Sequence, residues 1–503
     1  MASETNAQEL LDSGIRPQRA TERLRDSVLR RLQSAQNGGG KPRIDALRSL
    51  MPGVVMEDGA LESLVASLLS GGHVLVLGPP GSGKTTLAKA VWDLMPRDLF
   101  AVADCPLQCD PMSLVDAAFS RTVPPCPFCL HNHGGGMHSG AFDTARLKAK
   151  DVPVKRVQLR EGHGFARIQG SAEVFPDNLT GSVNLARLEE IGDPTSPLVL
   201  EPGKVLQAHR GFLLVDEVGK MPRGTQNVLL QALQEGNVTP AKTRETFPAD
   251  IVAVATSNLR DVGSITEPLS DRLSSVHHGL PTTAGANRRI VDLGLKDVDG
   301  MPVPGPYRDA AVRMMMLWRA RVEGGDDLAE VGSNRTLVEM LRRARAYAML
   351  EGASAMDPED LHRGARDAML GRVRARTPEG FEENRRTVSK FIEAQWKSAA
   401  KDGATDYWCR FYVGELKEDK AEALRTLQEV RNALGATDKT RLQGMLRAQG
   451  GEPRVRRFAL FVQEAEGVDR EGAAEVLPEV VKALDSLGAF DEKKAEGKLE
   501  AKA

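Results

Sequence analysis

One short segment constrains the fold of this chain more than any other. Residues 73–77 (HVLVL) form a continuous apolar run, as expected of a strand buried on both faces of a parallel sheet. The residues that follow fit the pattern G-x-x-x-x-G-K-[ST] at every fixed position, and a helical pattern begins where this motif ends. The motif and the residue after it are Gly78, Pro79, Pro80, Gly81, Ser82, Gly83, Lys84, Thr85 and Thr86.

This loop predicts a binding site for the phosphates of a nucleotide. Its glycines let the backbone wrap closely around phosphates, and the following helix adds the positive end of its dipole. We expect Lys84 to neutralise the β- and γ-phosphates of ATP and Thr85 to supply an oxygen ligand to Mg²⁺. The alternative, a glycine turn that binds nothing, is disfavoured because strand, loop and helix follow one another directly.

Similar apolar runs elsewhere predict an α/β fold. Residues 211–215 and 251–255 resemble the first run, and 99–103 is a fourth candidate strand. Helical patterns lie between them, which favours a parallel sheet built from βαβ units, and after about residue 285 only helical patterns follow. We therefore predict four parts: an N-terminal helical and flexible segment (1–42), an α/β nucleotide-binding domain (43–285), a helical small domain (286–375) and a helical C-terminal extension with a disordered tail (376–503).

Two adjacent carboxylates, Asp216 and Glu217, end the second apolar run. In open α/β sheets ligands bind beyond the carboxyl ends of the strands, so both side chains should face the nucleotide. We expect Asp216 to hold Mg²⁺ through water and Glu217 to polarise the attacking water. Solvent-exposed acids at a strand end are the alternative. Beside the phosphate loop, however, the pair predicts hydrolysis of ATP to ADP and phosphate.

Two further side chains are candidates for the same reaction. Asn258 follows the third run and is placed to orient water near the γ-phosphate, although an amide that only caps the next turn is the alternative. Arg272 lies far along the chain from the loop. This position suits a finger that enters a neighbouring subunit's site and stabilises charge in the transition state. A surface salt bridge is the alternative role for Arg272.

The stretch between Lys84 and Asp216 is much longer than one helix and one strand need, so it must contain an insertion. A cysteine-rich part of this insertion, at about 104–165, contains four of the five cysteines: Cys105, Cys109, Cys126 and Cys129. A C-x3-C pair followed by a C-x2-C pair has zinc-knuckle spacing. In a reduced cytosolic chain such cysteines are expected to bind metal rather than to form disulfides. Structural Zn²⁺, unligated thiols and redox chemistry stay open, and His131 or His133 could replace a cysteine as ligand.

In this order, the elements resemble an AAA+ ATPase over roughly residues 51–373. The similarity is closest to the branch of MoxR-type ATPases and the small ATPase subunit of magnesium chelatase. The stretches that carry it are LTGSVNLAR (179–187), LEPGKVLQAHRG (200–211) and LLQALQEG (229–236). The resemblance implies a P-loop AAA+ core, an insert in its second helix at about 166–206 and a hairpin at 236–247.

The resemblance also implies roles, cofactors and partners. Asn258 would be sensor 1, Arg272 the trans-acting finger, and Arg335 the sensor 2 contact to the γ-phosphate; a surface arginine at a helix start is the alternative for Arg335. ATP and Mg²⁺ would be the cofactors, and the subunits would form a ring, expected to be a hexamer. The ring would remodel or activate a protein partner, one with a von Willebrand A-type domain, in metal insertion or complex assembly.

A second resemblance leaves another activity open. The segments CPL (105–107), CPFC (126–129), DVPVKR (151–156) and LTGSV (179–183) are similar to PrkA-type proteins, AAA-like chains described as serine kinases. That branch tends to lose the acid pair, which is intact here, so hydrolysis is favoured over a serine protein kinase. A DNA-dependent motor is less favoured, because residues 236–247 hold only two basic side chains.

Composition argues against other classes. The 67 Lys and Arg residues nearly balance the 69 Asp and Glu residues, and only 4% of the residues are aromatic. Neither property suits an electrostatic nucleic-acid or membrane binder or a base-stacking platform. No apolar run approaches the roughly 18 residues of a membrane span, and the N-terminus lacks the order of a signal peptide. We therefore expect a cytoplasmic multidomain protein.

Overall fold

The computed structural model describes residues 5–37, 42–133, 147–194, 196–241, 245–295, 301–303, 305–322, 326–353, 356 and 358–402. Residues 38–41 of the predicted flexible segment and the chain from 403 onward, with the fifth cysteine, Cys409, and the predicted tail, lie outside these residues. The chain divides into two compact units, Met1–Pro281 and Thr282–Ala503, and each has its own hydrophobic core. No helix in the described part of the chain is both long and apolar enough to span a membrane.

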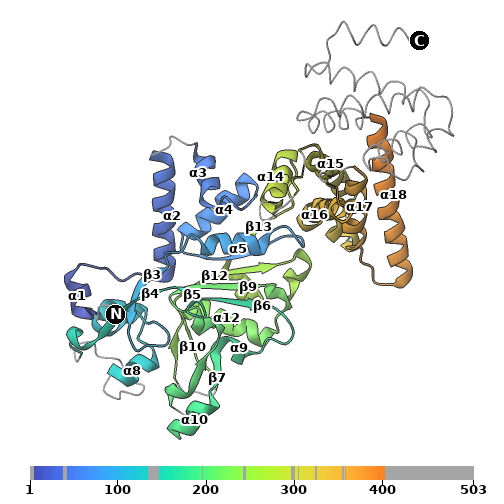
Figure 1. Cartoon of the computed structure of the whole chain (residues 1–503). Helices are drawn as coiled ribbons and strands as arrows, with labels where there is room; N and C mark the ends of the chain where they lie inside the picture. The colour runs from blue at the N-terminus through green and yellow to red at the C-terminus, as the bar shows by residue number, and fades with distance from the viewer. Residues whose placement is uncertain are drawn as a thin grey trace, which may run out of the picture. The chain divides into compact units, whose positions relative to one another are not determined.

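A six-stranded sheet forms the centre of the first unit (Figure 1). Neighbouring strands are parallel throughout. Their order is β13 (Leu273–His277), β2 (His73–Leu77), β12 (Ile251–Ser257), β9 (Gly211–Asp216), β6 (Gly164–Gln169) and β5 (Arg160–Glu161). The three strands predicted from continuous apolar runs, β2, β9 and β12, are adjacent. The predicted α/β fold with a phosphate loop and a parallel sheet is confirmed.

The central strands are buried on both faces because helices cover both sides of the sheet (Figure 1). Successive side chains of a strand point to opposite faces, so each strand contributes to two cores. Val74, Phe212 and Val254 belong to the core under α2 (Ala20–Asn37), α3 (Arg43–Leu50), α4 (Asp58–Leu69) and α5 (Lys84–Trp92). Leu75, Leu213 and Ala253 belong to the core with α9 (Pro176–Thr180), α11 (Lys204–Gln207) and α12 (Arg223–Glu235).

The fourth candidate strand lies outside the main sheet. It forms β3 (Asp98–Val102), which pairs antiparallel with β4 (Pro153–Gln158). With β1 (Thr5–Asn6) these strands make a separate three-stranded sheet, so the prediction that this run belongs to the parallel sheet was wrong. Its place beside β9 is taken by β6. The sequence pattern missed β6 because buried and exposed residues alternate along its second half near the sheet edge.

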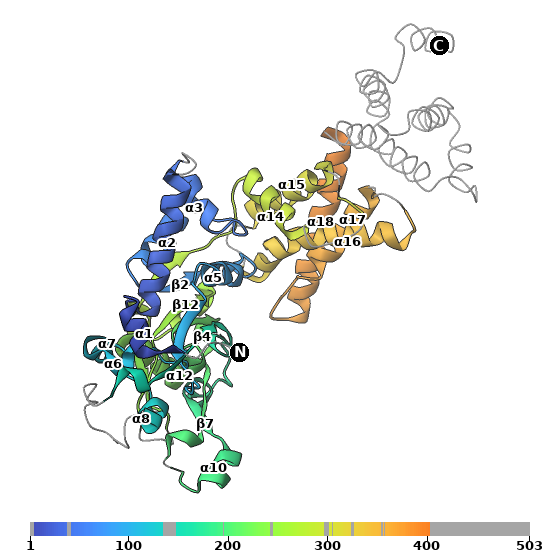
Figure 2. The same ribbon diagram turned by 60° about the vertical axis from the view of Figure 1, so that its left-hand side comes forward.

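Shorter elements surround these strands. β7 (Gly181–Val183) and β8 (Leu200–Pro202) pair antiparallel with α10 (Leu185–Ile191) between them, where an insert in the second helix was expected. α10 projects from the end of the first unit farthest from α3 (Figure 2). β10 (Asn237–Val238) and β11 (Phe247–Pro248) form the hairpin expected before the sensor strand. The others are α1 (Ala7–Asp12), α6 (Met112–Val115), α7 (Ala117–Thr122), α8 (Pro127–His133), α13 (Glu267–Asp271), and the 3₁₀ turns η2 (Ala149–Asp151), η3 (Pro197–Val199), η4 (Val218–Lys220) and η5 (Leu259–Ser264).

The second unit is helical in its described residues, as predicted. Trp318 and Phe391 are buried in its core, with ring centroids 4.9 Å apart. Phe391 lies in α18, so the first helix of the predicted extension is packed into the small domain rather than standing apart from it. The elements are α14 (Ala284–Leu295), α15 (Gly305–Arg321), η6 (Asp326–Gly332), α16 (Asn334–Leu350), α17 (Pro358–Leu370) and α18 (Pro378–Asp402).

The aromatic cluster on β9 should be essential for the stability of the first unit. Phe212 is fully buried, and its ring centroid lies 5.9 Å from that of Trp92 and 6.2 Å from that of Phe165. Phe212→Ala should lower the free energy of unfolding by about 3–5 kcal/mol, because it leaves a cavity that the sheet cannot close. The matched control, Phe175→Ala, truncates a side chain that is 63% exposed and should change it by less than about 0.5 kcal/mol. Denaturant unfolding followed by circular dichroism measures both, and equal losses would contradict the assigned core.

Candidate functional site

The loop between β2 and α5 has a backbone shape that only glycines allow. Gly81 and Gly83 have φ angles of 71° and 107°, which residues with a Cβ atom rarely adopt. A Cβ atom at Gly78 would lie 2.1 Å from the carbonyl oxygen of His278. Because the loop leads directly into the N-terminus of α5, it has the shape and position predicted for an anion-binding turn. The remaining residues of this motif lie here as well: Pro79, Pro80 and the buried Ser82 in the loop, and Thr86 exposed in the first turn of α5.

Lys84 connects this loop to the third apolar strand. Its buried Nζ donates at 2.9 Å to each of three acceptors, the carbonyl oxygens of Gly78 and Pro79 and the side-chain Oδ1 of Asn258. Asn258 reaches the loop because β12 pairs in parallel with β2, with Ser257 opposite Leu77. The predicted phosphate ligand and the predicted sensor are therefore in direct contact.

The two predicted magnesium ligands also lie together. The Thr85 hydroxyl is 3.0 and 3.2 Å from the two carboxylate oxygens of Asp216. The Thr256 hydroxyl donates to Asp216 at 2.5 Å and accepts the backbone N–H of Glu217 at 3.1 Å. A hydroxyl and a carboxylate side by side supply the hard oxygen ligands that Mg²⁺ prefers, so these residues fit the ion.

Arg167 of β6 is a partner of Asp216 that the sequence did not reveal. Its Nη2 lies 2.7 Å from Oδ2 of the carboxylate. Burial alone would raise the pKa of Asp216, but hydrogen bonds from Thr256, Arg167 and Thr85 outweigh burial and hold this pKa below its ordinary value. The carboxylate is therefore ionised near neutral pH, in the state that binds a cation. The alternating sequence of β6 hides Arg167, because no motif includes it.

Glu217 stands in a strained conformation at the end of β9. Its φ and ψ are 54° and 46°, in the left-handed region that residues other than glycine seldom occupy. Its carboxylate accepts a hydrogen bond from Gln169 at 2.9 Å and pairs with Lys220 at 3.0 Å. Gly170 allows this arrangement, since a Cβ atom there would lie 2.2 Å from the Glu217 carbonyl oxygen. Sequence reasoning did not assign Gln169 or Lys220 to the site.

The two predicted arginines lie in different units. Arg272 is exposed directly after α13 and has no ion-pair partner among the residues that the structure describes, so the salt-bridge alternative has no support there. Arg335 is exposed in the first turn of α16, just after the N-cap Ser333. Because Arg335 belongs to the second unit, its contact with the γ-phosphate stays a prediction.

The structure brings the four clustered cysteines together as well. Cys105, Cys109, Cys126 and Cys129 are buried and free, and their Sγ atoms all lie within 4.8 Å of one another. This cluster belongs to the insertion and not to the carboxyl edge of the main sheet.

Parts of this chain are similar to known proteins. A family model described as "Magnesium chelatase, subunit ChlI" matches residues 191–278, which contain the acid pair, Asn258 and Arg272. The chain is 28% identical over 323 residues to the magnesium-chelatase 38 kDa subunit of Acidiphilium rubrum, covering 60% of this chain and 84% of that protein. It is 24% identical over 380 residues to the archaeal Lon protease of Methanothermobacter thermautotrophicus, covering 63% of this chain and 58% of that protein.

A solved structure of a complex between BchI and BchD of magnesium chelatase is also similar, at 24% identity and a TM-score of 0.33, covering 66% of this chain and 98% of that chain. The fold itself is defined by the strand order of the sheet and by the loop between β2 and α5. The sequence relatives support the chelatase ATPase branch of AAA+ proteins. With the loop and the acid pair intact, the chain is an ATPase that hydrolyses ATP.

Arg167 should compete with Mg²⁺ for Asp216. The Arg167 side chain is 41% exposed, so the ion pair contributes at most about 1 kcal/mol after solvent screening. Arg167→Ala should therefore lower the Mg²⁺ concentration for half-maximal binding of a fluorescent ATP analogue by about two- to fivefold. A higher midpoint would instead assign Arg167 to the nucleotide. Arg160→Ala, which removes an exposed arginine from the edge strand β5, is the control and should leave the midpoint unchanged.

Proposed function

We propose that this chain is a Mg²⁺-dependent ring ATPase that uses hydrolysis to remodel or activate a protein partner. One observation supports the chemistry above all. Asp216 lies within hydrogen-bond distance of Thr85, Glu217 is held at the same strand end, and Lys84 contacts Asn258. Side chains proposed to contact phosphate, metal and the attacking water come from separate parts of the chain and lie at one edge of the sheet, as phosphoryl transfer to water requires.

In the proposed reaction each residue has one task. Lys84 neutralises charge on the β- and γ-phosphates, and Thr85 and Asp216 hold Mg²⁺, which supplies further charge neutralisation when bound. Glu217 polarises the water that attacks the γ-phosphorus, and Asn258 orients it. Arg335 is proposed to contact the γ-phosphate as sensor 2.

Arg272 supports the ring in this proposal. Its side chain is exposed and unpaired among the described residues, as expected of an arginine that completes the site of a neighbour. Head-to-tail contacts of this kind close into a ring when each subunit gives a finger and receives one. We propose a hexamer, by the resemblance to AAA+ ATPases.

The partner and location follow from the same resemblance. The proposed partner is a protein with a von Willebrand A-type domain, acted on in metal insertion or complex assembly, as the similarity to chelatase and MoxR-type ATPases implies. Nucleic acid is not a proposed partner, because acidic and basic residues balance along the chain. The proposed location is the cytoplasm, whose reducing conditions keep thiols free.

Replacing the proposed base tests the hydrolytic mechanism. Glu217→Gln keeps the size and hydrogen bonding of the side chain but cannot take up a proton. It should retain ATP binding, while the rate of phosphate release falls by about 10²–10⁴-fold. Glu382→Gln, at an exposed acid of α18, is the matched control and should hydrolyse ATP at the wild-type rate.

The same assay, run with γ-labelled ATP, separates hydrolysis from kinase activity. Label released as free phosphate supports the ATPase, whereas label found on protein serine would favour the PrkA-type alternative. Normal turnover in Glu217→Gln would refute the role of this residue.

Mixing two inactive variants tests the shared site. Arg272→Ala alone should lose about 10³-fold or more in turnover, since it lacks the finger for its neighbour. In rings assembled at random from equal amounts of the Arg272→Ala and Glu217→Gln chains, about a quarter of the interfaces join an intact glutamate to an intact arginine. Activity should therefore return on mixing, up to about that fraction of wild type. Mixed rings that stay as inactive as either variant alone would show that Arg272 does not act in trans.

A further inference from the structure

We propose that Cys105, Cys109, Cys126 and Cys129 bind one Zn²⁺ in a closed structural site, and that His209 joins this site to the two central strands of the sheet. The four sulfurs and the groups that contact them lie apart from the residues proposed for the ATPase reaction, so a metal here is independent of that reaction.

The sulfur positions match a single tetrahedral metal. Zinc binds thiolates at about 2.3 Å, which places the sulfurs of a tetrahedral site about 3.8 Å apart. All four Sγ atoms lie within 4.8 Å of one another, and those of Cys105 and Cys126 are 3.6 Å apart. The four side chains are at most 3% exposed. Four thiols gathered this closely away from water have few other hydrogen-bond partners, which favours metal over unligated thiols.

The backbone around each pair is shaped to present two sulfurs. Gln108 adopts a left-handed φ of 55°, its N–H donates to the Cys105 carbonyl oxygen, and the N–H of Cys109 points at the Cys105 sulfur at 3.5 Å. Cys126 directly precedes α8 and Cys129 lies in its first turn, so these two residues, three apart, face the same side of that turn. The Cys105–Cys109 loop thus has the turn of a zinc knuckle, and the Cys126–Cys129 pair supplies the other two sulfurs from a helix turn.

His209 contacts the cluster as a hydrogen-bond donor rather than as a ligand. Its Nδ1 accepts the backbone N–H of Asp250 at 3.1 Å, which requires that the ring proton be on Nε2. Nε2 lies 3.8 Å from the Cys109 sulfur, so its proton is directed at that sulfur. Outer hydrogen bonds of this kind stabilise a metal-bound thiolate and orient it.

The same residue anchors the cluster to the sheet. His209 lies two residues before the first residue of β9, and Asp250 directly precedes β12. Buried Arg210 donates to the Gln108 carbonyl oxygen at 2.9 Å and pairs with Asp110 at 2.6 Å, so both sides of Cys109 are tied to the start of β9. A metal here would fix the insertion against the amino ends of two strands whose other ends carry Asp216 and Asn258.

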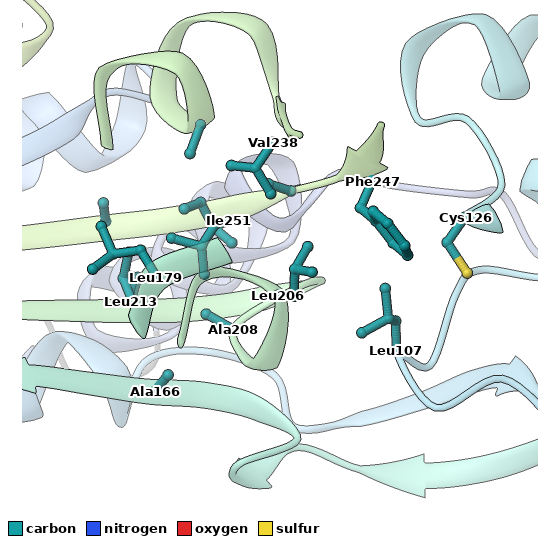
Figure 3. Packing of buried hydrophobic residues seen from close by; sticks show 14 of the residues in the cluster. Leu107, Cys126, Ala166, Leu179, Leu206, Ala208, Leu213, Val238, Phe247 and Ile251 are labelled. Atoms are coloured by element: carbon teal, nitrogen blue, oxygen red, sulfur yellow. The ribbon is translucent and has the colours of Figure 1, made fainter. Parts of the chain in front are cut away.

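The hairpin before β12 also packs on this cluster. Phe128, between Cys126 and Cys129, has its ring centroid 5.6 Å from that of Phe247 in β11. Figure 3 shows Phe247 beside Cys126 and Leu107 in the same core.

The ligand set is complete without histidine. His131 is exposed and His133 pairs with Asp104 at 3.0 Å, so neither is needed as a replacement ligand. Four cysteines around one tetrahedral ion leave no open position for water or substrate, which distinguishes a structural site from a catalytic one. An S₄ tetrahedron also suits iron, and metal analysis separates the two ions.

Metal analysis of the full chain, purified without a histidine tag, tests the site. We expect about one zinc per chain, lost in Cys105→Ser and in Cys129→Ser. The matched control is Cys409→Ser, which changes the cysteine outside the cluster and should keep the metal. Wild-type protein refolded with Co²⁺ should show the visible bands of tetrahedral thiolate coordination, a readout that does not depend on folding of the variants. Absence of metal, iron in place of zinc, or zinc retained by Cys105→Ser would overturn the proposal.

Competition with a chromogenic zinc chelator tests His209. His209→Ala keeps all four ligands but should weaken zinc binding by about 10–100-fold. In His209→Gln the amide oxygen can accept from Asp250 and the NH₂ group can donate to Cys109, so zinc binding should stay near that of wild type. Equal affinity in wild type and His209→Ala would remove His209 from the site. Binding of the fluorescent ATP analogue reports that each variant is folded.

Discussion

The parallel pairing of β12 between β2 and β9 is the constraint on which the rest of the site depends. Leu77 lies opposite Ser257, and Ala255 lies opposite Val215, so the three strands end at the same edge. A shift of one residue in either pairing would exchange side chains between two cores that are packed with different residues, which opposes the shift. Lys84, Asn258 and Asp216 meet because this register is fixed.

The parts of the fold that the sequence predicts are those in which burial and motif coincide. β2 and β9 are continuous apolar runs that lead directly into a glycine loop or an acid pair, so both the strands and their functional ends were recognisable. Along β6, buried residues alternate with more exposed ones. β3 is apolar, but it pairs with β4 outside the main sheet. Periodicity alone therefore gave neither the full strand order nor the place of β3. Arg167 was hidden for the same reason, because only the pairing of β6 with β9 brings it to Asp216.

The two central strands separate two kinds of chemistry. Their carboxyl ends carry the groups proposed to contact nucleotide, and their amino ends contact the cysteine cluster through His209 and Asp250. The seven residues of β12 span about 20 Å, so a metal at one end has no direct part in hydrolysis at the other. Any influence would pass through the position of the strands themselves. The match to the chelatase family begins at residue 191, after the cysteines, so the cluster is not part of what the chain shares with that family model.

The left-handed backbone of Glu217 has an evolutionary consequence. A side chain at this φ of 54° destabilises the fold by about 1–2 kcal/mol relative to glycine, which adopts the conformation without strain. Selection for thermal stability alone would therefore drive position 217 toward glycine, whereas selection for turnover, in the role proposed for Glu217, would keep a carboxylate there. Stabilised descendants of this chain would be expected to lose their enzymatic activity first at this position, while the sheet around it stayed intact.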